Sequence, residues 1–506
     1  MSLSTVLRPQ HNSDSLSVVS SFREAFSSPQ RLRIEVLGGL AVALALIPEA
    51  IAFSIVANVD PAVGLYASAL LAMVIALTGG RPAMISAATG AIALVVAPVA
   101  IQYGMDYLIA TVLLGGVFQV LLGFIGVAKL QRFIPRSVML GFVNALGILI
   151  FTAQLPHLVD VPWAVYPLVA LGIAVMIFWP KFTTAVPAPL VTIVLVALVA
   201  IGSGAQVPQV SDMGQLPDSL PSFFVPDVPL TVETLRIIAP YSLGFAVVGL
   251  MESLMTAKLV DGITDTHSNK TRESIGQGIG NIVQSFFGGM GGCAMIGQTM
   301  INVKESGART RLSTFVAGAA LLAFLVFAGD VVGLIPMAAL VGIMVMVSIG
   351  TVNWHSVHPR TLKLMPLSET ITMLVTVIAT LVTHNLAVGV ILGVLTAMVM
   401  FARRVAHLVS VEKVVVGGQT ATYRVTGQLF WASSNDLVYS FDYSDPSEHV
   451  VVDLTAAEIW DASTVATLDS IRHKYETRGA TVEFIGLDGA SKARLESLSG
   501  RLGEDG

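Results

Sequence analysis

Two carboxylates stand inside long apolar stretches of the sequence, where they could bind and release a cation. Glu49 follows Pro48, and Glu252 lies midway along the apolar residues 240–260. A carboxylate at the centre of a membrane-spanning helix costs about 2.5–3.5 kcal/mol, so such a residue is usually functional. Either residue could carry a proton, or Glu252 could bind Na⁺ together with the hydroxyl of Thr256 on the same helix face. A structural carboxylate that accepts bonds from backbone amides is the alternative.

A second group of candidate residues lies in two short, interrupted apolar segments, near residues 84–101 and 294–303. The tetrad AMIS opens the first segment at Ala83, the tetrad AMIG opens the second at Ala294, and a pair of glycines precedes each. Paired interrupted segments in two halves of a chain are typical of transporter binding sites. Two helices that begin inside a membrane, N-terminus to N-terminus, would present unpaired amide N–H groups to an anion. The alternative is a chance repeat whose glycines only allow close packing.

The composition indicates that these residues belong to a membrane protein. Of the 506 residues, 54% are hydrophobic and 12% are charged, which is about half the charged share of soluble domains. The single cysteine, Cys293, excludes an internal disulfide and a cysteine-based metal site, and the histidines are too scattered to form another. A net charge of −5 gives no support for nucleic-acid binding. We therefore expect a polytopic α-helical protein in a lipid bilayer, without a metal or a nucleic-acid partner.

Fourteen segments are expected to enter the membrane, because about 20 apolar residues cross a bilayer as a helix. Seven segments per half is an odd number, so the second half enters from the opposite side and the halves form inverted repeats. With alternating segments, all Lys and Arg residues of the connections except Arg236 lie on the side of the N-terminus. This bias predicts a multi-pass cell-membrane protein with both termini in the cytoplasm. Besides the two interrupted segments, spans are expected near residues 34–56, 61–78, 107–126, 135–155, 163–179, 187–202, 240–260, 275–287, 311–328, 331–350, 369–384 and 386–402.

The distribution of charge divides the chain into three parts. Residues 1–30 are rich in serine and are expected to form a disordered cytoplasmic tail, and residues 31–405 are expected to form the membrane domain. Charged residues return after residue 411, so residues 411–506 are expected to form a cytoplasmic domain of ordinary size. Its strands are expected at 421–430, 449–454 and 481–485 and its helices at 463–477 and 490–498, an alternation typical of a small α/β layer.

Several motifs, in this order, resemble the SulP family of anion transporters over nearly the whole chain. These motifs are Pro61–Ser68, Gly276–Asn281, Gly288–Gly297 and Ser306–Thr310. The resemblance implies two inverted seven-span repeats, a core domain that carries the anion past a gate domain as an elevator, and a homodimer. By position, it places anion contacts at Phe53, Thr89, Ala294, Met295, Ile296 and Gln298.

The resemblance also bears on the coupling ion. In a bicarbonate-transporting branch, an aspartate in the eighth span helps to bind Na⁺; the matching residue here is Glu252, and Thr256 matches its partner threonine. The change from aspartate to glutamate weakens the case for Na⁺. Proton-coupled relatives carry a carboxylate in the region of Glu49, which favours protons. The basic residue that vertebrate members carry in the tenth span is replaced by Thr299, which argues against a motor-like or fast-exchange role.

The C-terminal part resembles a STAS domain, which ends many SulP transporters. The stretches Asp453–Thr455 and Asp461–Ser463 are similar to the loop that carries a phosphorylatable serine in anti-sigma-factor antagonists. Ser463 matches that serine, so it is a candidate regulatory residue. The alternative, which we prefer because no kinase is implied, is that Ser463 is the N-cap of the following helix.

Together these features predict a secondary active transporter of a small inorganic oxyanion. Sulfate uptake by H⁺ symport fits them best. The alternatives are Na⁺-coupled uptake of bicarbonate or a dicarboxylate, an uncoupled exchanger or channel, and a nucleobase carrier. The sequence shows no nucleophile–base pair, phosphate-binding loop or metal cluster, so we do not expect an enzyme. Apart from the coupling ion, H⁺ or Na⁺, no cofactor is expected.

Overall fold

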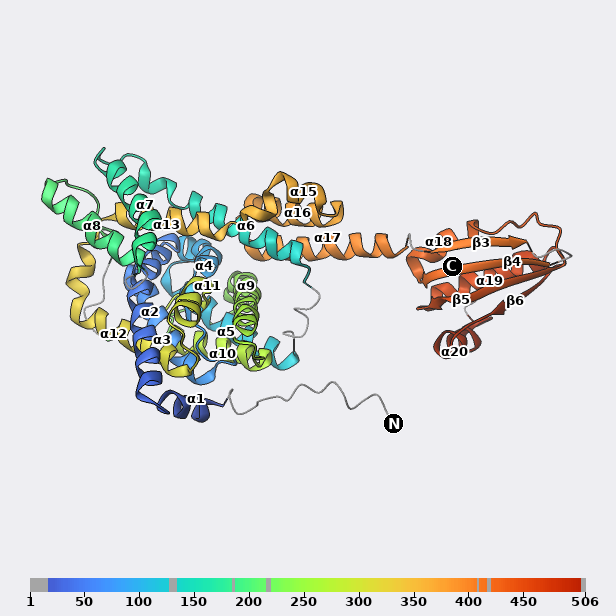
Figure 1. The fold of residues 1–506 in the computed structure, drawn as a ribbon, viewed down its shortest axis with the longest axis horizontal. Coiled ribbons are helices and arrows are strands. Elements are labelled where there is room, and N and C mark those ends of the chain that lie inside the picture. The colour runs from blue at the N-terminus through green and yellow to red at the C-terminus, as the bar shows by residue number, and fades with distance from the viewer. Residues whose placement is uncertain are drawn as a thin grey trace. The chain divides into compact units, whose positions relative to one another are not determined.

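A computed structural model describes residues 17–126, 134–183, 187–214, 220–406, 409–415 and 420–501. The chain divides into two compact units, Met1–Val394 and Leu395–Gly506. Figure 1 shows that helices build the first unit and that a sheet with helices builds the second.

Helices make up the first unit, and each of the fourteen predicted segments overlaps one of them. Within the described residues, seven helices are long and apolar enough to cross a membrane, and the other predicted segments also lie on helices. The short connecting helices are η4 (Leu155–Leu158), η5 (Val210–Met213), α14 (Trp354–Val357) and α15 (Pro359–Leu364). The remaining helices are α1 (Val18–Ala25), α2 (Pro29–Val56), α3 (Pro61–Thr78), α4 (Gly90–Tyr103), α5 (Met105–Ile125), α6 (Arg136–Thr152), α7 (Val165–Phe182), α8 (Ala188–Ser203), α9 (Val232–Thr264), α10 (Lys270–Ser285), α11 (Ile296–Met300), which continues as the π-helix η6 (Ile301–Glu305), α12 (Arg311–Gly333), α13 (Met337–Thr351), α16 (Leu367–Thr383) and α17 (Leu386–Ala406), which contains the boundary between the units.

The ends of several spans are encoded by local residues. Pro29 and Pro61 occupy the first positions of α2 and α3, where a missing N–H costs nothing. Gly126 and Gly204 end α5 and α8 in the left-handed conformation, with φ of 82° and 64°. The predicted start of α3 and the predicted ends of α5 and α8 lie within two residues of the observed ones, whereas α2 begins five residues before the predicted residue 34.

The N-terminal segment differs from the expected disordered tail. Residues 18–25 form α1, and the buried Ser21 accepts a hydrogen bond at 3.0 Å from the amide of Arg311, at the start of α12. An amphipathic helix of eight residues is too short to stand out as an apolar span, which is why the sequence did not reveal it. Residues 1–16 of the predicted tail lie outside the described residues.

The helices of the first unit pack in a pattern that repeats in reverse. Count α2–α8 as the first seven segments, and α9–α13, α16 and α17 as the second seven. Several of the most extensive helix contacts then have a counterpart seven segments on. The contact of α5 with α10 corresponds to that of α12 with α3, α2 with α12 to α9 with α5, and α6 with α16 to α13 with α7. We call α2–α5 with α9–α12 the core group, and α6–α8 with α13, α16 and α17 the gate group. These matched contacts agree with the two seven-segment repeats that the sequence predicted.

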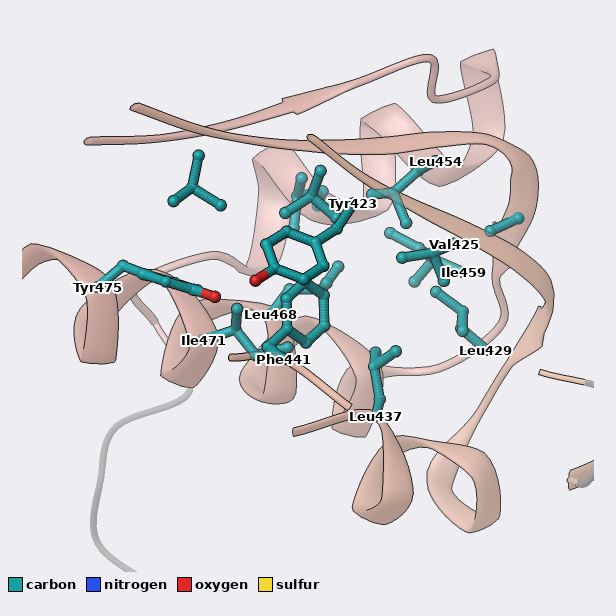
Figure 2. Packing of buried hydrophobic residues seen from close by; sticks show 14 of the residues in the cluster. Tyr423, Val425, Leu429, Leu437, Phe441, Leu454, Ile459, Leu468, Ile471 and Tyr475 are labelled. Carbon is teal, nitrogen blue, oxygen red and sulfur yellow. The ribbon is translucent and has the colours of Figure 1, made fainter. Parts of the chain in front are cut away.

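The second unit is a four-stranded sheet with three helices. Strand β3 (Ser410–Val415) pairs antiparallel with β4 (Thr420–Leu429), which lies parallel to β5 (His449–Ile459), and β6 (Thr481–Ile485) lies parallel to β5. The helices are α18 (Trp431–Tyr439), α19 (Ala462–Glu476) and α20 (Gly489–Leu498). Figure 2 shows Tyr423 and Val425 of the sheet packed with Leu468 and Ile471 of α19. The predicted α/β layer is therefore confirmed, whereas β3 and α18 were not expected.

Close helix packing in the core group yields a testable prediction. A Cβ atom on Gly278 of α10 would lie 2.6 Å from the carbonyl oxygen of Gly116 on α5, whereas one on Gly262 of α9 meets nothing within 4 Å. Gly278→Ala should therefore force α5 and α10 apart and destabilise the protein by about 1–3 kcal/mol. Gly262→Ala is the matched control. Thermal unfolding of the purified protein measures both, and equal melting temperatures would contradict this packing.

Candidate functional site

Two helices of the core group begin inside the unit, directly after a pair of very short strands. Strands β1 (Ser86–Ala87) and β2 (Cys293–Ala294) pair antiparallel, with Ser86 opposite Ala294 and Ala87 opposite Cys293. Helix α4 follows β1 with Thr89 as its N-cap, and α11 follows β2 with Met295 as its N-cap. The pairing therefore brings the N-termini of the two helices together, as the sequence predicted.

The repeated tetrads, however, do not occupy equivalent places. The copy that starts at Ala83 ends at the first residue of β1, whereas the copy that starts at Ala294 runs from β2 into α11. The helices begin at Gly90 and Ile296, rather than near residues 84 and 294. The structural repeat is the short strand and the helix that follows it, and the tetrad match is a coincidence of sequence.

Unpaired amide groups gather where the two helices begin. Thr89 Oγ1 accepts from the amide of Ile92, while a methionine side chain caps no N–H of α11. In the described part of the chain, the amide N–H groups of Gly90, Ala91, Ile296 and Gly297 make no hydrogen bond. Gly90 and Ala91 are buried, Ile296 is half-buried and Gly297 is exposed, so an anion could reach these donors from the side of Gly297.

A cavity of about 520 Å³ adjoins these N-termini and lies between the core group and the gate group. Helix α2 contributes Glu49 and Phe53 to its wall, α9 contributes Glu252 and Met255, and α6 and α13 supply much of the rest. Among the described residues that line it, none is Lys, Arg or His. A Cβ atom on Gly297 would meet nothing within 4 Å, so the backbone of α11 borders open space there.

Glu252 lies beside both interrupted segments, which we call the broken segments: β1 with α4, and β2 with α11. Its Oε2 accepts a hydrogen bond from the thiol of Cys293 at 2.8 Å, and that sulfur lies 3.1 Å from Thr89 Oγ1. Thr256 is placed differently, because its Oγ1 donates to the main-chain oxygen of Glu252 at 2.9 Å and does not line the cavity. The carboxylate and the hydroxyl, which could share Na⁺ in the alternative to proton coupling, thus point to different neighbours.

The other residues expected at the site divide into two sets. Phe53, Thr89, Met295 and Ile296 line the cavity. Ala294 lies in β2 and its amide donates to Ser253 Oγ at 3.1 Å, so it presents no free donor. The buried side chain of Gln298 lies behind the cavity wall and interacts with the carboxyl group of Glu49. Sequence reasoning missed the gate-group residues of the wall, such as Phe142, because they carry no chemical signal.

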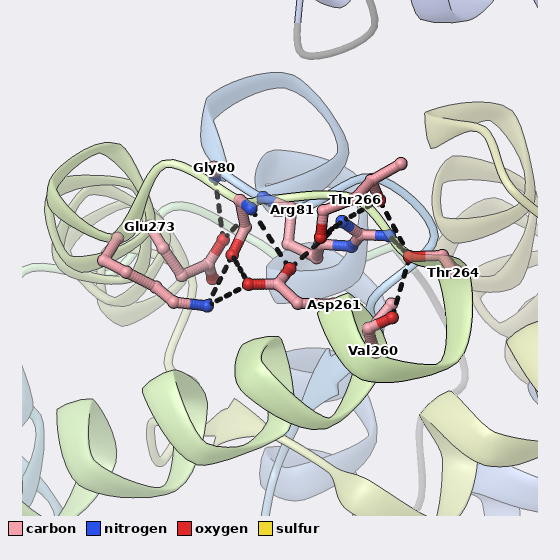
Figure 3. A network of polar contacts seen from close by, with 9 residues as sticks. Gly80, Arg81, Val260, Asp261, Thr264, Thr266 and Glu273 are labelled. Carbon is pink, nitrogen blue, oxygen red and sulfur yellow. Dashed lines mark hydrogen bonds and ion pairs between the residues drawn. The ribbon is translucent and has the colours of Figure 1, made fainter. Parts of the chain in front are cut away.

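A network of charges holds the loop that leads into β1 (Figure 3). Arg81 forms an ion pair with Asp261 at 3.1 Å and donates to Thr264 and Thr266, and Lys270 contacts Asp261 at 2.7 Å. Glu273 Oε2 accepts from the amides of Gly80 and Arg81 at 2.7 and 3.0 Å. The network joins α9, α10 and the start of the broken segment. Sequence reasoning missed this network, because Arg81 lies 180 residues before its partner Asp261.

In the second unit, Ser463 is an exposed residue in the first turn of α19. The N-cap of α19 is Asp461, whose Oδ1 accepts from the amide of Thr464 at 3.0 Å and whose Oδ2 accepts from the amide of Trp431 at 2.6 Å. The preferred interpretation of Ser463 as the cap is therefore wrong. In strand β5, hydrogen bonds from the side chain and the amide of Thr455 hold the pKa of Asp453 below its usual value.

Comparisons with known proteins agree with this architecture. The model of the sulfate permease family matches residues 32–165 and 159–376, and the STAS domain model matches residues 411–499. A Bacillus subtilis protein named "Putative sulfate transporter YbaR" is 50% identical over 468 residues, which cover 92% of this chain and 97% of that protein. The bicarbonate transporter BicA of a Picosynechococcus strain is 27% identical over 523 residues, which cover 93% and 91% of the two chains.

Solved structures show the same fold at low sequence identity. The murine Slc26a9 anion transporter superposes with a TM-score of 0.83 at 14% identity, covering all of this chain and 93% of that one. The transmembrane domain of a cyanobacterial BicA superposes with a TM-score of 0.64 at 24% identity, covering 73% of this chain and 98% of that one. The predicted polytopic fold with a C-terminal STAS domain is therefore confirmed.

The capping of α19 can be tested directly. Asp461→Ala removes the side-chain acceptor from the helix and should cost about 1 kcal/mol, so amides in the first turn of α19 should exchange about fivefold faster. Ser463→Ala, the control in the same turn, should leave exchange unchanged. Hydrogen exchange of the full-length protein, read by mass spectrometry, distinguishes the two. Faster exchange in Ser463→Ala alone would restore Ser463 as the cap.

Proposed function

The chain belongs to the sulfate permease family, and we propose that it takes up a small inorganic oxyanion by H⁺ symport. Sulfate is the substrate that we propose first. Its family membership also means that it is a transporter and not an enzyme. We place it in the cell membrane with both termini in the cytoplasm, as a homodimer. The name of YbaR, at 50% identity, is what favours sulfate over other oxyanions.

The anion would bind at the N-termini of α4 and α11. The free N–H groups of Gly90, Ala91, Ile296 and Gly297 can donate to oxyanion oxygens, and the two helix dipoles add positive potential at the same point. Backbone N–H groups recognise an oxyanion by its acceptor oxygen atoms and its negative charge. Such a site does not need a lysine or an arginine. Phe53 closes over the start of α4, since a Cβ atom on Gly90 would lie 2.9 Å from its ring.

Proton coupling is supported by one observation above all: two carboxyl groups and no cationic side chain line the cavity in the described part of the chain. At an effective dielectric of 20, two negative charges 5 Å apart repel by roughly 3 kcal/mol. An anion therefore binds more favourably when Glu49 or Glu252 is protonated, and anion and proton bind together. This linkage is what symport requires.

Sodium coupling with bicarbonate as the substrate is the second candidate, and the relationship to BicA favours it. It would use the carboxylate of Glu252 and the hydroxyl of Thr256. In this conformation a thiol faces the carboxylate instead. A thiol is a softer ligand than the oxygens that hard cations prefer.

The arrangement of the two helix groups supports an elevator mechanism. The anion site belongs to the core group through α4 and α11, while α6 and α13 of the gate group form the opposite wall of the cavity. Movement of the core group past a gate group that stays in place would carry the anion together with both carboxyl groups.

The role of the carboxyl groups predicts the effect of neutralising them. A gradient of one pH unit supplies about 1.4 kcal/mol per proton, so Glu252→Gln should lower pH-driven accumulation of sulfate about tenfold. Uptake down a sulfate gradient should persist, and Glu49→Gln should act in the same direction. Glu233→Gln, an exposed position on the same helix α9, is the matched control. Measured in proteoliposomes, normal pH-driven accumulation by both cavity variants would contradict proton coupling.

The position of the anion predicts a steric effect at Gly297. Because the space beside it is open, Gly297→Trp should fill the cavity without displacing the backbone and raise the KM for sulfate roughly tenfold or more. Gly262→Trp, whose Cβ atom also meets nothing within 4 Å, is the control outside the cavity. An unchanged KM in Gly297→Trp would place the anion elsewhere.

A further inference from the structure

Helix α10 carries three fully buried polar side chains on one face, spaced by one turn. They are Glu273, Gln277 and Asn281. Buried polar groups between helices usually bond to the neighbouring helix, but these three bond largely to the broken segments and to each other. Glu273 holds the loop before β1, as Figure 3 shows. The other two act nearer to the anion site.

Gln277 fixes the first broken segment. Its Nε2 donates to Ser86 Oγ at 2.7 Å and to Glu273 Oε1 at 2.9 Å. Ser86 is the first residue of β1 and lies opposite Ala294 of β2. Four residues after Ser86, α4 begins at Gly90, so the contact sits just behind the free N–H groups.

Asn281 fixes the second broken segment in the same way. Its Oδ1 accepts from the amide of Gly292 at 3.0 Å, and its Nδ2 donates to the carbonyl of Gly292 at 3.0 Å and to Gln119 Oε1 at 2.9 Å. The carboxamide therefore pairs with both backbone groups of one residue, as a neighbouring strand would. Four residues after Gly292, α11 begins at Ile296. In both halves, the residue that α10 holds therefore lies four residues before the first residue of the half-helix.

The short strands need this support. Each of β1 and β2 has only two residues, and such a pair makes too few hydrogen bonds to be stable alone. Gly292 also approaches β1 closely, since a Cβ atom there would lie 2.1 Å from the carbonyl oxygen of Ala87. Donors that bind a charge must hold their positions within a few tenths of an ångström, which requires a supporting layer behind them.

We propose that Gln277 and Asn281 are positioning residues that set the separation of the N-termini of α4 and α11, and with it the affinity for the anion. Neither side chain lines the cavity. The inference rests on the proposed anion site. It assigns α10 the role of a rigid template from which both half-helices are aligned.

The test compares Gln277→Leu and Asn281→Leu with Gln284→Leu in sulfate uptake by proteoliposomes. Gln284 is the control because it is fully buried on α10 and its Nε2 donates only within that helix, to the main-chain oxygen of Asn281 at 3.3 Å and to its Oδ1 at 3.5 Å. Asn281 Oδ1 keeps its shorter bond of 3.0 Å from the amide of Gly292 when Gln284 is replaced. The two positioning variants should raise the KM for sulfate roughly tenfold with little change in maximal rate, because displaced donors bind the anion less well. Gln284→Leu should keep the wild-type KM, and all three should lose similar thermal stability.

A double-mutant cycle and hydrogen exchange sharpen the test. Ser86→Ala removes the acceptor of Gln277, so its effect on KM should largely vanish in the Gln277→Leu background. Amides of residues 86–92 and 292–298 should exchange faster in the two positioning variants than in Gln284→Leu.

The outcomes separate the inference from the proposed function. If the wild-type protein takes up sulfate but both positioning variants keep its KM, the positioning role alone is overturned. The same holds if their amides exchange no faster than those of Gln284→Leu. A wild-type protein that takes up neither sulfate, bicarbonate nor fumarate overturns the proposed function, and the positioning role with it.

Discussion

The structure depends on two helices, α4 and α11, that begin at a cavity within the apolar first unit, where their first amide groups have no partner in the helix. A helix leaves its first N–H groups without intrahelical partners, and burying them without acceptors costs free energy. The pairing of β1 with β2 places the starts of α4 and α11 side by side, and in the described part of the chain the amides of Gly90, Ala91, Ile296 and Gly297 have no acceptor. We propose that an oxyanion accepts from these donors, so that the backbone itself provides the binding site.

The use of backbone donors also explains which charged side chains line the cavity. A site made of backbone donors needs no lysine or arginine, which leaves carboxyl groups as the charged residues of the cavity wall. Glu252 contacts Cys293 of β2, and Glu49 interacts with Gln298 of α11. Each carboxyl group therefore contacts the second broken segment, which is formed by β2 and α11. The buried polar face of α10 then aligns both segments from behind. Binding, coupling and positioning are thus joined through contacts within the core group.

The sequence predicts those parts of this arrangement that depend on residue composition and on the length and periodicity of apolar segments. The spans follow from their apolar length, and Glu252 was found because a carboxyl group in an apolar run is rare. The strands β1 and β2 escaped notice because two residues have no periodicity, and the repeated tetrad suggested helix starts several residues too early. Helical spacing places Thr256 on the face of Glu252 but says nothing about the direction in which its hydroxyl donates. Asp461 and Ser463 are equally good N-caps by residue type, so only the structure decides between them.

The most direct test of the central claim is to measure proton and sulfate fluxes together in proteoliposomes that start with equal pH and no Na⁺ on the two sides. An inward sulfate gradient is imposed, and the pH of the lumen is followed with a trapped dye while labelled sulfate is counted. If the anion binds together with a proton, sulfate entry should acidify the lumen, and Glu252→Gln should allow entry with less acidification. Sulfate entry without any change in luminal pH, or entry that requires added Na⁺, would contradict the account.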